Sequence, residues 1–358
     1  MAKFNFNPKY SITSSIINNI SKIEQLKEQI NNLPVTPHLM ASLRESAKLI
    51  TTHYSTQIEG NRLTQEQVID VIKNKKVIPQ RKRDENEIKG YYKAIQFVEK
   101  LAIRKSLISE EDLNKIHSLV ENNKEVKYRD GQNVITDSLT GEIVYMPPEA
   151  TDIPTLMKDF IDWLNLDKET PILIMAGIAH YQYVTIHPYY DGNGRSARLL
   201  TTLILHKNGY DLKGIYSLEE YYAKDLNGYY NAITVGPSHN YYMGRADADI
   251  TNWIEYFIQG VKESFEKVYE KAKLESGAKD LSPILRNLDV KQRKILQLFE
   301  NQKTITSSDI ADFFNFAPRT ARKLAQDWVE EGFLVIANFS KKSRKYTLSN
   351  ILESKLFE

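Results

Sequence analysis

The segment from His187 to Arg198 constrains the fold of this chain more than any other, because it places two glycines between two long helical patterns. It reads His-Pro-Tyr-Tyr-Asp-Gly-Asn-Gly-Arg-Ser-Ala-Arg, and apolar residues recur at helical spacing before it (171–186) and after it (195–207). Gly192 and Gly194 let backbone amides approach an anion closely, and the helix that follows points its positive end at the same place. The segment therefore predicts a phosphate-binding turn between two helices.

Four side chains of this segment suit phosphate chemistry. Arg195 and Arg198 lie one helical turn apart, so both can donate bidentate hydrogen bonds to one polyphosphate. Asp191 supplies a hard oxygen ligand of the kind that Mg²⁺ bridging those phosphates requires. His187 precedes the turn, where an imidazole can take a proton from a hydroxyl. Each feature alone is common and usually structural, but together they offer a base, a metal ligand and an anion site.

The joint pattern resembles the signature of the Fic family, H-x-F-x-(D/E)-G-N-(G/K)-R-x-x-R, at every defined position except the third, where Tyr189 replaces Phe. This exchange of one aromatic for another keeps the packing, but a buried tyrosine hydroxyl needs a hydrogen-bond partner. The resemblance extends over about residues 10–262. We therefore expect a Fic fold.

Two further segments are similar to parts of the same family. Residues 141–148 resemble its flap hairpin, which holds a segment of the target protein as an added strand, although an ordinary surface hairpin would read the same way. Tyr229 and Tyr230 resemble the tyrosines that line its adenine pocket, although paired tyrosines on a helix also serve as plain core. The resemblance thus implies a target protein bound along residues 142–148.

The resemblance implies a protein adenylyltransferase, a nucleotidyltransferase that moves AMP from Mg·ATP to a target protein or to the chain itself. His187 would deprotonate a Ser, Thr or Tyr hydroxyl, which attacks the α-phosphate of ATP, and pyrophosphate would leave. Asp191 would hold Mg²⁺, and Arg195 and Arg198 would bind the β- and γ-phosphates. The turn itself would stabilise the α- and β-phosphates through Gly192, Asn193 and Gly194.

A second motif lies upstream, at residues 55–61. It resembles the family's inhibitory motif, (S/T)-x-x-x-E-(G/N), with Ser55, Glu59 and Gly60 at the defined positions. A carboxylate brought to the phosphate turn would pair with an arginine and remove the partner of the γ-phosphate, and the resemblance assigns this role to Arg198. The same residues also read as a helix that ends at a glycine, and both interpretations can hold because Gly60 would set where Glu59 sits.

Helical periodicity dominates the rest of the chain. It recurs at residues 14–30, 39–56, 64–73, 88–98, 110–121, 153–164, 225–235 and 249–269, whereas 132–148 alternates like a β-hairpin around a Ser-Leu-Thr-Gly turn. We expect a mainly α fold of four parts. These are an N-terminal helical domain with the inhibitory helix (1–80), a Fic catalytic domain with a β-hairpin flap (85–262), a helical linker (263–282) and a winged helix-turn-helix domain of α+β type (283–358).

The C-terminal part shows the order helix, helix, turn, helix and hairpin, which is that of a winged helix-turn-helix. The three helices are expected at 292–300, 307–314 and 318–331, and the two strands within 333–348. Residues 284–358 carry 13 Lys+Arg against 9 Asp+Glu, and the basic residues gather on the third helix and at the tip of the hairpin: Arg319, Arg322, Lys323, Lys341, Lys342, Arg344 and Lys345. DNA binding through residues 283–358 is one interpretation. Protein docking is the other.

The whole chain is nearly neutral, with 48 Lys+Arg and 46 Asp+Glu, so no global field favours nucleic acid or a membrane. It has no cysteine, which excludes disulfides and thiolate chemistry, and it has no apolar run of the length that spans a bilayer. These features favour a cytoplasmic protein. The sequence allows a homodimer without requiring one.

Three functions compete at this point. A protein adenylyltransferase inhibited by Glu59 is the first. The second is a DNA-binding regulator whose Fic domain senses a nucleotide. A Fic enzyme that uses another donor, or that removes AMP from its target with Glu59 positioning water, is the third.

Overall fold

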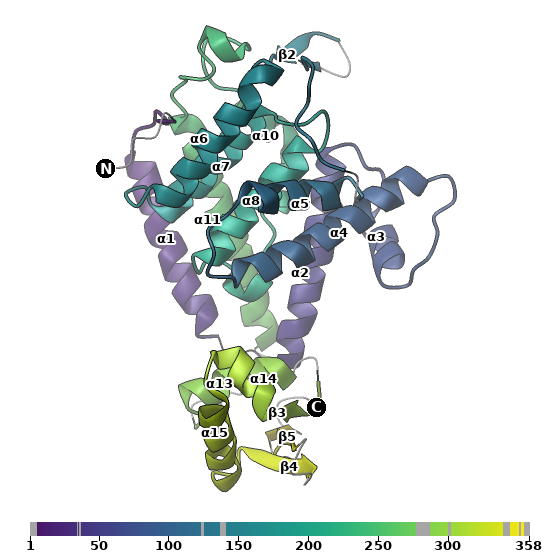
Figure 1. Ribbon diagram of the computed structural model, residues 1–358, viewed down its shortest axis with the longest axis vertical. Coiled ribbons are helices and arrows are strands. Elements are labelled where there is room, and N and C mark those ends of the chain that lie inside the picture. Colours follow the sequence, from purple (N-terminus) through teal and green to yellow (C-terminus); the bar gives the residue numbers. More distant parts are fainter. Residues whose placement is uncertain are drawn as a thin grey trace. The chain divides into compact units, whose positions relative to one another are not determined.

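The computed structural model describes residues 6–33, 35, 37–122, 125–136, 141–276, 287–299, 302–338, 344–350 and 352–353. The chain divides into two compact units, one made of residues 1–29 and 46–268 and the other of residues 30–45 and 269–358 (Figure 1). Helices dominate, which confirms the predicted mainly α fold class. The four predicted domain boundaries stay a prediction.

The helices up to residue 276 agree closely with the expected ranges. They are α1 (Ser14–Asn31), α2 (Pro37–Ile58), α3 (Gln65–Ile72), α4 (Lys82–Ala102), α5 (Glu110–Val120), α6 (Ile153–Leu166), α7 (Ile172–Ile186), α8 (Asn193–Lys207), α9 (Glu219–Lys224), α10 (Leu226–Ile233) and α11 (Thr251–Ser276). The sequence analysis did not predict α9, because six residues are too few to show a helical period. Capping boxes at Thr64 and Ser109 fix where α3 and α5 begin.

The centre of the first unit is α7, whose side chains are buried on nearly every face. It packs against α8, and α8 packs against α4 and α5 (Figure 1). Because α7 is packed on nearly all sides, the core fixes the position of its last residues. The turn that joins α7 to α8 is therefore held between two buried helices.

A short hairpin lies between α5 and α6. Its strands are β1 (Ile135–Thr136) and β2 (Ile143–Tyr145), which pair antiparallel with Ile135 opposite Tyr145 and Thr136 opposite Ile143. This is the hairpin predicted for the flap. Most of the predicted Ser-Leu-Thr-Gly turn lies outside the described residues, which resume at Gly141.

The second unit contains α13 (Val290–Phe299), β3 (Ile305–Thr306), α14 (Ser307–Phe314), α15 (Pro318–Glu330), β4 (Leu334–Asn338) and β5 (Lys345–Leu348). The three strands form an antiparallel sheet in the order β3-β5-β4 over a core that includes Ile295, Ile310, Trp328, Phe333 and Tyr346. The order of helices and strands is the predicted one, with β3 added because two residues leave no readable pattern. Lys341 and Lys342 of the predicted basic tip lie outside the described residues.

In the part of the chain that the structure describes, no helix combines the length and the apolar character needed to cross a bilayer.

Candidate functional site

The turn between α7 and α8 is held in an unusual backbone conformation. His187 ends α7 with φ of +51° and ψ of +59°, in the left-handed region, and its N–H donates to the Tyr183 carbonyl at 3.0 Å. Gly192, with φ of +74°, precedes the first residue of α8, and its carbonyl accepts the first helical hydrogen bond from the Ser196 N–H. The two left-handed residues fold the intervening chain into a loop over the amino end of α8, where backbone amides have no helical partner.

Asn193 fastens this loop from inside. Its side-chain oxygen accepts from the Tyr189 N–H at 3.0 Å, and its amide group donates to the Tyr189 carbonyl at 2.7 Å. Both ends of the buried amide are therefore used on the loop itself. The Asn193 side chain therefore helps to fix the shape of the loop. The resemblance assigns a second role to Asn193, which is to bind phosphate.

Tyr189, which replaces the family's phenylalanine, is buried, and its hydroxyl has a partner. The hydroxyl donates to Asn114 Oδ1 at 2.5 Å, and the ring stacks on His117 with centroids 3.7 Å apart. His117 in turn lies 2.9 Å from the Ser196 hydroxyl. The exchange thus keeps the aromatic packing, and α5 supplies the polar partner that the sequence analysis required.

His187 presents a neutral imidazole with a defined tautomer. Nδ1 lies 3.3 Å from the Val184 carbonyl, and since a carbonyl only accepts, Nδ1 carries the proton and Nε2 is left with its lone pair. Burial lowers the pKa of His187 to about 4. The imidazole is therefore unprotonated at neutral pH, as a general base must be.

Arg195 is fixed by two carboxylates. Its Nη2 lies 3.0 Å from Glu121 Oε1 and 3.3 Å from Asp191 Oδ1, and its side chain is 4% exposed. Nε of Arg195 is buried without a hydrogen-bond partner among the described residues. An unused guanidinium donor at a helix amino end is a feature that a phosphate oxygen would satisfy.

Asp191 is the exposed carboxylate of the loop. Burial acts to raise the pKa of Asp191, but the charge of Arg195 and the hydrogen bond from the Gly192 N–H outweigh it and hold the pKa below the ordinary value. The carboxylate is therefore ionised at neutral pH. Within the described residues, no group of three or more His, Asp or Glu side chains is arranged to hold a metal ion.

Arg198, one turn further along α8, is held by α2 and the residue that follows it. Nη2 of Arg198 lies 2.8 Å from Glu59 Oε1 and donates to the Ser55 carbonyl at 2.8 Å, while Nε donates to the Ser55 hydroxyl at 2.8 Å. Burial disfavours the charge of Arg198, but the Glu59 carboxylate more than offsets this and raises the pKa of Arg198. Two residues of the predicted inhibitory motif thus occupy Nε and Nη2 of this arginine.

Glu59 also lies directly over the amino end of α8. A Cβ placed on Gly194 would come within 2.5 Å of Glu59 Oε1, so only glycine permits this approach. Gly60, with φ of +91°, ends the turn after α2 and lets the chain leave at that point. The carboxylate therefore lies against Gly194 and Arg198, two of the residues to which the resemblance assigns the polyphosphate.

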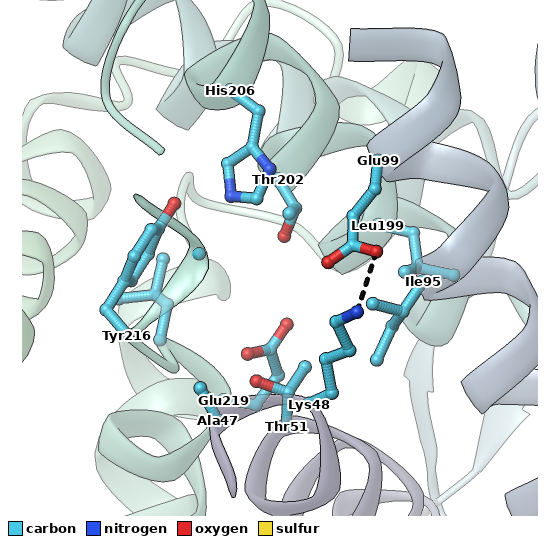
Figure 2. Close-up of a pocket in the computed structure, with 12 residues that line it drawn as sticks. Ala47, Lys48, Thr51, Ile95, Glu99, Leu199, Thr202, His206, Tyr216 and Glu219 are labelled. Carbon is cyan, nitrogen blue, oxygen red and sulfur yellow. Dashed lines mark ion pairs between the residues drawn. The ribbon is translucent and has the colours of Figure 1, made fainter. Parts of the chain in front are cut away.

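The same face of α2 carries further polar contacts to the core. Lys48, Thr51 and Ser55 follow one another at helical spacing toward Glu59, and Lys48 pairs with Glu99 of α4 at 3.0 Å. Figure 2 shows Lys48, Thr51, Thr202 and Glu219 around a small cavity beside this stripe, and burial raises the pKa of Glu219. Helix α2 is thus docked on the domain partly through polar groups.

The predicted adenine tyrosines differ from each other. Tyr229 is buried among Tyr222 and Trp253, and its hydroxyl lies 2.9 Å from His180 Nε2. Tyr230 is 45% exposed, and its hydroxyl donates to the Ile58 carbonyl at the end of α2, at 3.4 Å. Tyr230 thus contacts the end of α2, whereas Tyr229 lies in the core.

The flap exposes two apolar side chains of β2. Ile143 and Val144 of β2 are 49% and 38% exposed, whereas Tyr145 is buried and donates its hydroxyl to the Thr185 carbonyl at 2.5 Å. Thr185 lies two residues before His187. The exposed part of the flap is therefore anchored at the end of the helix that carries the imidazole.

Several residues of the site come from outside the motifs. Asn114, Glu121 and Arg129 contact the loop from positions that are 58 to 75 residues away along the chain. No local pattern identifies such residues, because their role depends on which helices pack together.

Comparison with known proteins confirms the predicted Fic domain. Residues 107–205 match the model of the Fic/DOC family. A Fic family protein from Desulfovibrio desulfuricans shares the fold with a TM-score of 0.61 at 23% identity, covering 96% of this chain and 99% of the other. Fic-1 from Caenorhabditis elegans gives a TM-score of 0.55 at 23% identity, covering 72% of this chain and 71% of that chain. Residues 107–205 are thus similar to the Fic/DOC family, and these two solved structures share the fold of the chain.

Curated relatives are enzymes by name. The protein adenylyltransferase fic-1 of C. elegans is 31% identical over 211 residues, which cover 57% of this chain and 41% of the relative. The protein adenylyltransferase Fic of Nematostella vectensis is 30% identical over 200 residues, which cover 53% of this chain and 45% of the relative. The chain thus spans less than half the length of these relatives.

Proposed function

We propose that this chain transfers AMP from Mg·ATP to a hydroxyl of a target protein and that Glu59 inhibits the transfer. The observation that carries the proposal is the placement of Glu59, whose carboxylate lies 2.8 Å from Arg198 and over Gly194 at the amino end of α8. A carboxylate held in an anion site is the simplest competitor for a phosphate. The names of the curated relatives support the same activity.

His187 acts as the general base in this proposal. A Ser, Thr or Tyr hydroxyl of the target gives its proton to Nε2 of His187, and its oxygen forms a bond to the α-phosphorus of ATP. The bond between that phosphorus and the oxygen bridging to the β-phosphate breaks, and pyrophosphate leaves with the electron pair. The Val184 carbonyl keeps the proton on Nδ1, so the accepting nitrogen is always Nε2.

The developing charge is balanced mostly by groups that are already in place. The amides of Asn193 and Gly194 face the α- and β-phosphates, and the Gly192 amide joins them once its hydrogen bond to Asp191 is released. Arg195 donates its Nε, which has no partner among the described residues, to the leaving phosphates. Arg198 binds the γ-phosphate once Glu59 has left it. The buried loop and Arg195 therefore need little reorganisation, whereas Arg198 must first be released.

Mg²⁺ fits this site through Asp191. Mg²⁺ is usually held by one or two carboxylates together with substrate phosphates and water, and Asp191 is an exposed, ionised carboxylate beside the phosphate turn. When bound, the ion would neutralise phosphate charge in the transition state.

The adenine and the target are assigned to two neighbouring surfaces. Tyr230 offers an exposed ring face for adenine, with Tyr229 packed behind it at a centroid distance of 5.3 Å. The target segment would bind along residues 142–148 and pair with β2 near Ile143 and Val144, which are exposed. Autotransfer would use the same strand with a segment of this chain.

Three proteins test the proposal: wild type, Glu59→Gly and Glu59→Gly/His187→Ala. Each is incubated with Mg²⁺ and ATP labelled on the α-phosphate, alone and with cell lysate, and label on protein is counted. We expect strong labelling only by Glu59→Gly. No labelling by that variant, with ATP binding and folding verified, would contradict the proposal. Removal of AMP from labelled protein by wild type would favour the opposite reaction.

A second candidate function belongs to the C-terminal unit. Arg319, Arg322 and Lys323 of α15 are all exposed, while Ala321 and Trp328 face the core. We propose that this face binds the phosphate backbone of DNA. A gel-shift titration of duplex DNA at rising salt tests this: we expect binding that weakens with salt and with alanine at the three basic positions. Salt-independent binding, or none at low salt, would contradict it.

A further inference from the structure

Arg129 is a buried arginine whose three guanidinium nitrogens each donate to a backbone carbonyl. It is 2% exposed and lies between α5 and the flap. Its Nε donates to the His187 carbonyl at 2.9 Å, Nη1 to the Gly131 carbonyl at 3.0 Å and Nη2 to the Pro148 carbonyl at 2.5 Å. Its own N–H donates to the Pro188 carbonyl at 3.0 Å. One side chain thus joins the backbone of the proposed base to the backbone on both sides of the flap.

The His187 carbonyl has a particular need for such a donor. It lies at the carboxyl end of α7, where the last carbonyls have no helical partner. The residue is also a non-glycine in the left-handed region, a conformation that persists only where the surroundings enforce it. The Arg129 guanidinium supplies a charged hydrogen bond at this point, and it therefore helps to determine where the imidazole points.

The flap side of the contact is equally specific. Gly131 and Pro148 flank β1 and β2, so their carbonyls mark the two ends of the hairpin where it joins the domain. A second tie runs in parallel, because the Tyr145 hydroxyl of β2 donates to the Thr185 carbonyl. The base of the flap and the end of α7 are thus connected twice.

The charge of Arg129 makes this connection stiff. Among the described residues, the guanidinium of Arg129 hydrogen-bonds to three carbonyls, and burial lowers the pKa of Arg129. A buried cation that loses one of its acceptors is left partly unsatisfied, which is strongly unfavourable. A displacement of Pro148 or Gly131 is therefore transmitted to the guanidinium and from there to the His187 carbonyl.

We propose that Arg129 is a positioning residue that couples the flap to the general base, so that a target segment pairing with β2 sets the orientation of His187. This inference rests on the proposed transfer reaction, in which His187 is the base and β2 receives the target. Arg129 itself contacts neither substrate. Its role is to make correct placement of the base depend on the state of the flap.

The test compares Arg129→Met and Arg129→Lys in the Glu59→Gly chain. Lys127→Met is the matched control, because Lys127 lies two residues away along the chain. Its side chain is 80% exposed and forms an ion pair with Glu125. Initial rates of labelling from α-labelled ATP into lysate protein are measured against Mg·ATP concentration. In parallel, ¹⁵N spectra of histidine-labelled protein follow the His187 ring nitrogens, assigned by their loss in His187→Gln.

We expect Arg129→Met to lower kcat at least tenfold while the KM for Mg·ATP stays within about twofold, and Arg129→Lys to recover part of the loss. The His187 ring signals should shift or broaden in Arg129→Met, and the Lys127→Met control should match its parent in both readouts. If Arg129→Met does not fold, kcat and the His187 ring signals are compared between Arg129→Lys and its parent, and both should change in the same direction by a smaller amount.

Labelling within twofold of the parent, or unchanged His187 signals, would overturn the inference. A Glu59→Gly parent that labels nothing would instead count against the proposed function, and the spectra would then decide the role of Arg129 by themselves.

Discussion

Arg195 and Arg198 lie one turn apart on α8, and each is held by a glutamate, yet the two pairs are built differently. Arg195 is bound by Glu121, at the end of α5 within the domain that also contains the turn. Arg198 is bound by Glu59, just after α2, where the carboxylate is 28% exposed and the next residue is a glycine in the left-handed region. In the proposed function, the contact within the domain orients Arg195, whereas the contact from the exposed end of α2 occupies Arg198. The first pair would thus prepare the site, and the second would close it.

The largest fall in transfer rate is expected from the loss of His187, because phosphate binding by the two arginines leads to transfer only when a base takes the hydroxyl proton. In the Glu59→Gly chain, His187→Ala should lower the transfer rate by about 10²–10⁴-fold, the range typical of a general base. Single-turnover labelling from α-labelled ATP measures this. A loss below about tenfold would mean that another group takes the proton, and the comparison of the two arginines would then need a different reaction.

Next in size is the release of Arg198. Glu59→Gly removes a charged hydrogen bond worth about 1.5–3 kcal/mol, so transfer should rise by about ten- to 150-fold over wild type. Glu59→Gln keeps the size of the side chain without its charge and should raise transfer less. Initial rates at saturating Mg·ATP check both. Equal rates for wild type and Glu59→Gly would remove the inhibitory role from this pair.

The pH dependence of Glu59→Gly tests whether the base is tuned as its burial implies. The pKa of His187 is lowered to about 4, so the neutral imidazole persists down to that pH, and kcat/KM should stay level from pH 8 to about 5. An ordinary histidine, with a pKa of about 6.5, would already have lost about tenfold at pH 5.5. In Glu59→Gly, the loss of the Glu59 charge lowers the pKa of His187 further. The fall in kcat/KM is therefore still expected only at acidic pH, below about 5. A midpoint near 6.5, with circular dichroism showing an intact fold, would contradict the assignment.

Glu121→Gln should act in the opposite direction to Glu59→Gly. Glu121 is one of the two charged partners of Arg195, and a neutral glutamine in its place leaves the arginine less firmly oriented. We expect transfer in the Glu59→Gly chain to fall by about three- to tenfold, mainly through a higher KM for Mg·ATP. Initial rates over a range of Mg·ATP concentrations separate KM from kcat. A rise in transfer would show that Glu121 also occupies its arginine, and the distinction between the two pairs would be lost.

The smallest effect concerns Ser55, the second partner of Arg198. Ser55→Ala in the otherwise wild-type chain removes one hydrogen bond to Nε but leaves the Ser55 carbonyl and Glu59 in place, so basal transfer should rise about threefold at most. Thr52→Ala is the matched control, since the Thr52 hydroxyl bonds only the Lys48 carbonyl of its own helix at 2.7 Å. A change of the same size in both variants would point to a general loosening of α2.

The same comparison shows what the sequence could and could not predict. The Glu59–Arg198 contact spans 139 residues, yet it was predicted because both ends lie in motifs with a resemblance to known ones. The Glu121–Arg195 contact spans 74 residues and was missed, because it follows from the packing of α5 against α8. Helices with full periodicity were predicted to within a few residues, while α9 and β3 were not, because they are too short to carry a period.

The most direct test of the central claim is to give the Glu59→Gly chain ATP labelled on either the α- or the γ-phosphate, with Mg²⁺ and lysate, and to follow label on protein together with released pyrophosphate. The account predicts label on protein from the α-phosphate alone, with one pyrophosphate released for each label transferred. Label on protein from the γ-phosphate, or no label on any protein although ATP is bound, would contradict it.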